Sequence, residues 1–221
     1  MEGETANPSA DGGERELVQK VLARDPKAWE VLVHRFAPLV HLAVHRALMH
    51  FGKESARAPI PPGSLYLTRD LLAPEAPVGL VSAAFQTEPG LDLLVCNAGG
   101  YFEVPFLDMD ATRWERTMNL NVQATYFIAQ AFARELVKRR RPGAIVTTCS
   151  TNGFQPEDDC TAYDISKGAL VMLTRTLAQS LAVHRIRVNG IAPGVIRTEL
   201  NAPLLDPASV RHYEKKTLLA R

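Results

Sequence analysis

The chain has 221 residues, of which 46% are hydrophobic and 22% are charged, and 25 basic against 24 acidic residues give a formal net charge of +1. This composition is typical of one globular domain, or one domain with a small appendage, and it excludes a collagen-like or wholly disordered chain. The near-neutral charge gives no argument for a nucleic acid or an anionic membrane as a partner, and no apolar run approaches the ~18 residues of a membrane span.

The first 50 residues are predicted to contain a polar tail and two helices. Residues 1–13 are acidic and polar, which is typical of a disordered tail and not of a secretory signal. Apolar side chains recur at helical spacing over residues 14–24, and a second apolar stripe runs from Pro26 to about His50. Asp25 and Pro26 lie between the two predicted helices. Asp25 is expected to be the N-cap of the second helix, and Pro26 its first residue. We therefore expect an N-terminal helical pair over residues 14–50.

A linker is predicted between this part and the rest of the chain. Residues 51–63 contain three prolines and two glycines, which interrupt regular structure. After it, strand-like runs alternate with helix-like runs. The strands are expected at 64–68, 91–96, 144–149 and 185–191, and the helices at about 74–86, 111–138, 162–183 and 207–218. This alternation is typical of an α/β domain with a parallel sheet and flanking helices, here over residues 64–221.

Three polar residues in the second part suggest proton-transfer chemistry. Tyr163 and Lys167 are four apart and share one helix face. A neighbouring ammonium favours the phenolate, so we expect a lowered pKa for Tyr163, which suits proton exchange near neutral pH. Ser150 stands at the end of a predicted strand, where open α/β sheets place their ligands, and its hydroxyl can bind a substrate oxygen. A Tyr-x-x-x-Lys pair alone occurs by chance on many helices, so the argument depends on its setting.

That setting consists of several ordered motifs. Asp70-Leu71 follows the first predicted strand, Asn97-Ala98-Gly99 the second, and Pro193-Gly194-Val195-Ile196 with Thr198 the fourth, while Asn121 lies in the long helix between. With Ser150, Tyr163 and Lys167, these motifs make residues 62–221 resemble the short-chain dehydrogenase/reductase family.

The resemblance implies a Rossmann-like sheet, NAD or NADP as cofactor, and interconversion of a small-molecule alcohol and a carbonyl. It implies a catalytic tetrad of Asn121, Ser150, Tyr163 and Lys167. Tyr163 would be the general acid or base, Lys167 would tune it, Ser150 would hold the substrate oxygen, and Asn121 would help to hold a water in a proton relay. The implied cofactor-binding residues are Asp70 and Leu71 near the adenine, then Asn97, Ala98, Gly99, Tyr163, Lys167, Pro193, Gly194, Val195, Ile196 and Thr198.

One family motif is missing from the sequence. No Thr-Gly-x-x-x-Gly-x-Gly turn, whose backbone approaches the cofactor pyrophosphate, is found, and few residues follow Thr198. We therefore expect a truncated sheet of three to four strands and weak cofactor binding. The strand at 64–68 is expected to move beside the strand at 91–96, to fray, or to recruit another chain. The substrate, the choice of cofactor and the formation of a homo-oligomer stay open.

Residues 14–50 resemble the start of region two of bacterial RNA polymerase sigma factors. The helices and the DNA-binding domain that follow in that family are not found, so we expect no contact with polymerase or nucleic acid. A helical pair packed on the sheet is the favoured interpretation. The alternative for the whole chain is a non-catalytic pseudoenzyme or a chimeric interaction module. The change near residue 60 also fits two unrelated coding segments joined there.

Histidines and cysteines suggest no further site. His41 and His45 are four apart, but no third ligand is evident, so we expect no metal. Cys149 adjoins Ser150 and is interpreted as strand packing, not as a nucleophile. The odd number of cysteines, outside metal-ligand spacing, favours a reducing cytoplasm over a disulfide framework.

Overall fold

The computed structural model describes residues 67, 69–196 and 206–216. The tail, helical pair and linker predicted over residues 1–63 lie outside these ranges, as does Thr198, so the domain boundaries and the sigma-factor resemblance stay predictions. None of the helices in the described ranges is long and apolar enough to cross a membrane.

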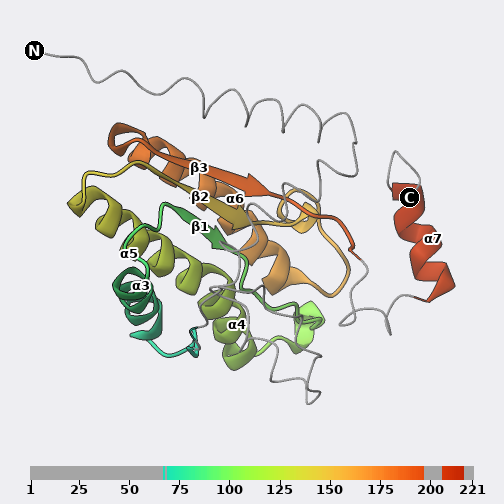
Figure 1. Ribbon diagram of the computed structural model, residues 1–221. Helices are drawn as coiled ribbons and strands as arrows, with labels where there is room; N and C mark the ends of the chain where they lie inside the picture. The colour runs from blue at the N-terminus through green and yellow to red at the C-terminus, as the bar shows by residue number, and fades with distance from the viewer. Residues whose placement is uncertain (1–66, 68, 197–205, 217–221) are drawn as a thin grey trace, which may run out of the picture. The chain divides into compact units, whose positions relative to one another are not determined.

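A three-stranded parallel sheet is the centre of the described part of the chain. Its strands are β1 (Leu93–Cys96), β2 (Gly143–Thr148) and β3 (Ile186–Ile191), hydrogen-bonded in the order β1-β2-β3 (Figure 1). The register pairs Leu94 with Ile145, and Ile145 with Val188. The three strands confirm the predicted parallel sheet.

The strand expected at 64–68 falls almost wholly outside the described residues. Of its residues only Leu67 is described, and Leu67 is not part of a strand. Its side chain is half-buried and packs against the hydrophobic core. Where the rest of that segment lies stays a prediction.

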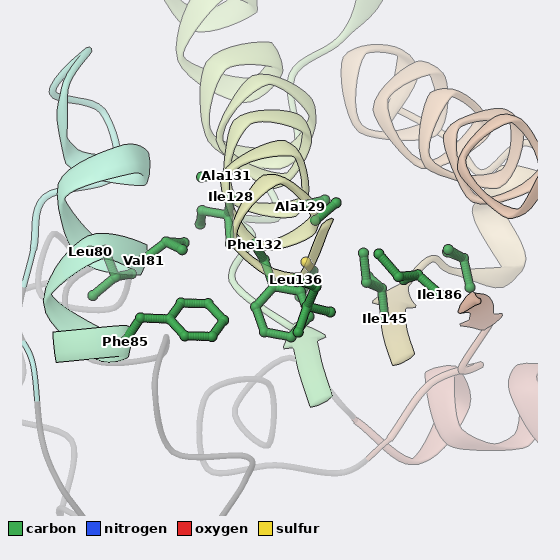
Figure 2. Close-up of a cluster of buried hydrophobic side chains, with 13 residues drawn as sticks. Leu80, Val81, Phe85, Ile128, Ala129, Ala131, Phe132, Leu136, Ile145 and Ile186 are labelled. Carbon is green, nitrogen blue, oxygen red and sulfur yellow. The ribbon is translucent and has the colours of Figure 1, made fainter. Parts of the chain in front are cut away.

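Two helices, α5 (Ala124–Lys138) and α6 (Thr161–Leu181), cover one face of the sheet, and α3 (Ala76–Thr87) lies beside α5 (Figures 1 and 2). Helix α5 contacts β1 and β2, α6 contacts β2 and β3, and α3 packs against α5. The connection from β1 to β2 and the connection from β2 to β3 move in the same direction along the sheet. Because such connections are right-handed, their helices, α5 and α6, lie on the same face. A further helix, α7 (Pro207–Lys216), begins after Asp206, whose carboxylate accepts a hydrogen bond from the Ser209 N–H.

The hydrophobic core lies between these helices and the sheet (Figure 2). Leu136 of α5 and Ile145 of β2 are fully buried, and the rings of Phe85 and Phe132 join α3 to α5 with their centroids 5.6 Å apart. Burying each such side chain contributes roughly 1.5–3 kcal/mol. This packing fixes the positions of the strand ends that carry the candidate residues.

The long helix predicted at 111–138 is not uniform. It consists of α4 (Ala111–Met118), a π-helical turn at Asn119–Gln123, and α5. Asp110 caps α4, because its carboxylate accepts a hydrogen bond of 2.8 Å from the Arg113 N–H. The wider turn carries Asn121 into the interior, where it is fully buried. The apolar spacing runs through the turn without a break, so the sequence pattern does not reveal it.

Candidate functional site

The carboxyl ends of the three strands meet at one edge of the sheet because the strands are parallel. Asn97 directly follows β1, Ser150 follows β2, and Pro193 follows β3. The Thr148 hydroxyl at the end of β2 donates to Asn97 Oδ1 over 3.0 Å. The Thr151 N–H donates to the Pro193 carbonyl over 3.1 Å. Hydrogen bonds thus connect all three of the loops that carry predicted site residues.

Asn121 binds the loop after β1 to helix α6. Its Oδ1 accepts the Gly100 N–H over 2.8 Å, and its Nδ2 donates to the Gly100 carbonyl over 3.0 Å and to Ser166 Oγ over 2.9 Å. Both N–H bonds of the side-chain amide are therefore engaged. A Cβ at Gly99 would lie 3.2 Å from Asn121 Oδ1 and 3.7 Å from Lys167 Nζ, so glycine lets the backbone pass close to both groups.

Tyr163 and Lys167 lie on adjacent turns of α6, as the spacing predicts. The Lys167 ammonium stands 5.5 Å from the centre of the Tyr163 ring and donates to the Thr148 carbonyl over 2.9 Å. Lys167 is only 6% exposed. The positive charge is thus fixed between the sheet edge and the phenol.

The predicted direction of the Tyr163 pKa was wrong. Burial raises the pKa of Tyr163 above its ordinary value, although a hydrogen bond with the Ser150 hydroxyl acts to lower it. Burial also lowers the pKa of Lys167, because the low-dielectric interior disfavours its charged form. The sequence pattern placed the two groups together but carried no measure of how deeply both would be buried.

Asn152 binds Ser150, and Asp164 binds Asn152; the sequence analysis singled out neither of these two polar residues. Its hydroxyl donates to Asn152 Oδ1 and accepts the Asn152 backbone N–H, each over 3.2 Å. The side-chain amide of Asn152 donates in turn to Asp164 Oδ1 over 2.7 Å. Asp164 adjoins Tyr163 in sequence. The only signal for this pair was the presence of polar side chains next to the two predicted catalytic residues.

Tyr101 is another neighbour that the sequence analysis missed. Its ring meets the Tyr163 ring edge-on, with 4.9 Å between the centroids. Its hydroxyl donates to Glu103 Oε1 over 2.8 Å and lies 3.1 Å from Cys160 Sγ. Burial, followed by these two contacts, raises the pKa of Tyr101. Its place directly after the Asn-Ala-Gly-Gly run was the one available signal.

The predicted cofactor-binding residues divide into two groups. Asn97 and Gly99 lie at the sheet edge with the tetrad, and Gly194 approaches Thr151 there. The side chains of Val195 and Ile196 are exposed. Asp70 and Leu71 lie in the turns before α3, where Asp70 accepts the Leu72 N–H over 3.1 Å and Leu71 packs against the core. These last two contacts are local to their own segment.

The three cysteines of the chain are free thiols, and all three are buried. Cys149 Sγ lies beside the hydroxyls of Thr147 and Thr174, at 3.7 and 3.9 Å, which agrees with its interpretation as strand packing. Burial raises the pKa of Cys96 to about 12. Among the described residues, no three His, Cys, Asp or Glu side chains are grouped to hold a metal ion. His41 and His45 lie outside those residues.

Several known proteins of similar sequence and structure are reductases or dehydrogenases by name. The 5-keto-D-gluconate 5-reductase of Escherichia coli is 38% identical over 132 residues, which cover 59% of this chain and 52% of that protein. The crystal structure of a putative short-chain alcohol dehydrogenase from Sinorhizobium meliloti matches with a TM-score of 0.67 and 33% identity, over 72% of this chain and 63% of that one.

A gluconate 5-dehydrogenase from Burkholderia cenocepacia, in complex with NADP and tartrate, matches with a TM-score of 0.65 and 29% identity, over 71% of this chain and 61% of that one. The chain spans about half the length of the curated relatives that it matches. The short chain dehydrogenase family matches residues 46–208, and the strand order and sheet-edge motifs described above agree with that match. The chain therefore belongs to the short-chain dehydrogenase family.

Proposed function

We propose that the chain is an oxidoreductase that uses NAD or NADP to interconvert a small-molecule alcohol and a carbonyl. The observation that best supports this proposal is the convergence of the predicted tetrad at one edge of the sheet. Asn121 and Lys167 flank Gly99, the Lys167 ammonium stands over Tyr163, and the Ser150 hydroxyl acts to lower the pKa of Tyr163. Membership of the family agrees with this chemistry.

The roles of the side chains follow from their chemistry. Tyr163 takes a proton from the alcohol or gives one to the carbonyl oxygen. The charge of Lys167 favours the phenolate that is left when the proton departs. Ser150 holds the substrate oxygen. The cofactor, when bound, accepts or supplies the hydride.

Asn121 has a positioning role in this proposal, beside the water-holding role that the family resemblance implies. Both N–H bonds of its amide already donate to Gly100 and Ser166. The side chain therefore fixes the turn at Gly99 and Gly100 against α6. A Cβ at Gly99 in that turn would lie 3.7 Å from Lys167 Nζ.

The residues at the sheet edge fit the nicotinamide end of a cofactor. Gly99 leaves space beside Lys167 that a larger residue would fill, and Asn97 is held by Thr148. We propose that Asn97, Ala98, Gly99 and Lys167 hold this end, together with Pro193, Gly194, Val195, Ile196 and Thr198. The sequence lacks the glycine-rich turn that contacts the pyrophosphate, so we expect weak binding, with no preference assigned between NAD and NADP.

The first substrate to test is a keto sugar acid. The names of two relatives refer to 5-keto-D-gluconate and to gluconate as compounds that those proteins act on. We propose the same substrate class for this chain. The assay follows NADH or NADPH oxidation with 5-keto-D-gluconate, and NAD or NADP reduction with D-gluconate.

Matched variants separate the proposed chemistry from general damage. We expect Tyr163→Phe and Lys167→Ala to lower turnover by roughly a hundredfold or more, since general acid–base groups contribute effects of this size. Tyr126→Phe and Lys138→Ala change an exposed tyrosine and an exposed lysine of α5, and they should leave turnover unchanged. Equal rates in Tyr163→Phe and Tyr126→Phe would contradict the proposed role of Tyr163.

A further inference from the structure

The hydroxyl of Tyr101 joins the loop after β1 to the start of helix α6. It donates to Glu103 Oε1 over 2.8 Å and lies 3.1 Å from the Sγ of Cys160, which directly precedes α6. A phenol has one proton to give and an ionised carboxylate only accepts, so the Cys160 thiol is the donor in the second contact. Cys160 is only 1% exposed. The tip of the Tyr101 side chain is therefore held by one partner from its own loop and by one from the buried start of α6.

The backbone on both sides of Tyr101 is bonded to other elements as well. The preceding residue, Gly100, is bound through its N–H and its carbonyl to the side chain of Asn121. Three residues after Tyr101, the N–H of the buried Val104 donates to the Asp159 carbonyl over 2.8 Å. A side chain anchored at its tip and along its backbone loses little further conformational freedom when it packs against a neighbour.

The neighbour of the anchored Tyr101 ring is the ring of Tyr163. The two centroids are 4.9 Å apart and the ring planes stand at 84°, which is the edge-to-face arrangement that aromatic pairs favour. The Lys167 ammonium contacts the same ring, 5.5 Å from its centre. Lys167 and Tyr163 share helix α6, whereas Tyr101 comes from a different element. Tyr101 therefore ties the Tyr163 ring to the loop that follows β1.

We propose that Tyr101 is a positioning residue that fixes the ring of Tyr163 at the sheet edge through the contact of the two rings. This inference rests on the proposed function, in which Tyr163 exchanges the substrate proton. That transfer requires the phenol oxygen to lie within hydrogen-bond reach of the substrate oxygen, and a displacement of about 1 Å is enough to slow such a step. Tyr101 takes no part in the proton transfer itself.

The first test observes the Tyr163 ring in the whole chain, without cofactor or substrate. A tyrosine fluorinated beside its hydroxyl replaces Tyr163, and its fluorine NMR signal is recorded. Tyr101→Leu removes the neighbouring ring, whereas Tyr101→Phe keeps the ring and removes only the hydroxyl. Tyr126→Leu is the matched control, because Tyr126 of α5 is 42% exposed, against 41% for Tyr101, and meets the Phe127 ring edge-on with 5.3 Å between the centroids.

We expect Tyr101→Leu to move and sharpen the fluorine signal, because a packed ring shifts the resonances of its neighbour and restricts the motion of that neighbour. Tyr101→Phe should move the signal less than about half as far, since it keeps the edge-to-face pair. A shift in Tyr101→Leu no larger than that in Tyr126→Leu overturns the proposal, and so do equal shifts in Tyr101→Leu and Tyr101→Phe. If circular dichroism shows that Tyr101→Leu does not fold, the more adaptable Tyr101→Met takes its place under the same criteria.

The second test measures turnover of 5-keto-D-gluconate by the same variants. Tyr101→Leu should lower kcat roughly tenfold and leave KM within about twofold, because a misplaced proton donor slows the reaction without removing a substrate contact. Tyr101→Phe should recover most of the lost kcat, and Tyr126→Leu should change neither constant. An unchanged kcat in Tyr101→Leu overturns the proposal. A raised KM with an unchanged kcat also overturns it, because Tyr101 would then bind substrate instead of positioning Tyr163.

The two tests separate this inference from the proposed function. If Tyr163→Phe lowers turnover but Tyr101→Leu leaves the fluorine signal in place, the positioning role is wrong and the function stands. If the signal moves as expected but the natural chain and Tyr163→Phe have the same turnover, or none, the function is wrong and Tyr101 still fixes the Tyr163 ring.

Discussion

Tyr163 and Lys167 make opposite contributions to stability at alkaline pH. The folded pKa of Tyr163 is raised above 10.0, so its contribution is complete below pH 10.0 and is lost as the pH rises through the folded value. The folded pKa of Lys167 is lowered below 10.5. Between that lowered value and 10.5, the unfolded chain therefore binds more protons than the folded chain, and the free energy of unfolding rises with pH.

The tyrosine contribution can be isolated by substitution. As the pH rises above 10.0, we expect Tyr163→Phe to lose less free energy of unfolding than the natural chain, with a slope difference of at most about 1.4 kcal/mol per pH unit. Urea unfolding at each pH measures this difference. Tyr126→Phe, at an exposed position of α5, is the control and should follow the natural chain. Parallel curves for Tyr163→Phe and the natural chain would contradict the direction of the Tyr163 shift.

Asn121 is the residue whose loss should cost the most stability at the site. Asn121→Leu has a similar volume but leaves the N–H and carbonyl of Gly100 and the Ser166 hydroxyl without this partner. Each unsatisfied buried group costs about 1–3 kcal/mol, so we expect a loss of about 3 kcal/mol or more. Denaturant unfolding measures it, with Asn189→Leu at an exposed position of β3 as the control. A loss below about 1 kcal/mol would show that these bonds are replaced by others.

At the scale of elements, the positions of the strands and helices could be predicted from the sequence better than the irregular turns and loops between them. The short runs around Val95, Ile145 and Val188 each form a strand, and Ile145 and Val188 are buried. The π-helical turn at Asn121 has no periodic signature, because it depends on a bond to Gly100 far along the chain. The same reason explains why Asn152 was missed: its partners, Ser150 and Asp164, meet only when the loop after β2 packs on α6.

The contact between that loop and α6 depends on one glycine. A Cβ at Gly153 would lie 2.9 Å from the Lys167 carbonyl oxygen, so Gly153→Ala should push the Ser150 loop away from α6. We expect a loss of about 1–3 kcal/mol, as for other overpacked sites. Gly79 of α3 has no atom within 4 Å of such a Cβ. Gly79→Ala should therefore raise stability by about 0.5–1 kcal/mol, and thermal unfolding of the two variants compares them directly.

At the scale of the whole molecule, the open question is whether this chain binds a nicotinamide cofactor. We expect calorimetric titration with NADH and NADPH to give weak, saturable binding that Lys167→Ala weakens further, because Lys167 adjoins the space at Gly99. Lys138→Ala is the matched control on an exposed helix position. Absence of binding at millimolar cofactor, with a chain shown to be folded, would confine the relationship with the family to ancestry.

The buried thiols give the molecule an internal reporter of its own opening. Cys96 lies in the core beneath the helices, Cys149 follows β2 and Cys160 precedes α6, so the three sample different parts of the described structure. The thiolate is the reactive form, and with the pKa of Cys96 raised to about 12 it is scarce near neutral pH while the chain is closed. Because all three thiols are buried, alkylation at each cysteine should require its surroundings to open. Comparing the three rates would distinguish local opening around the candidate site from cooperative unfolding of the sheet.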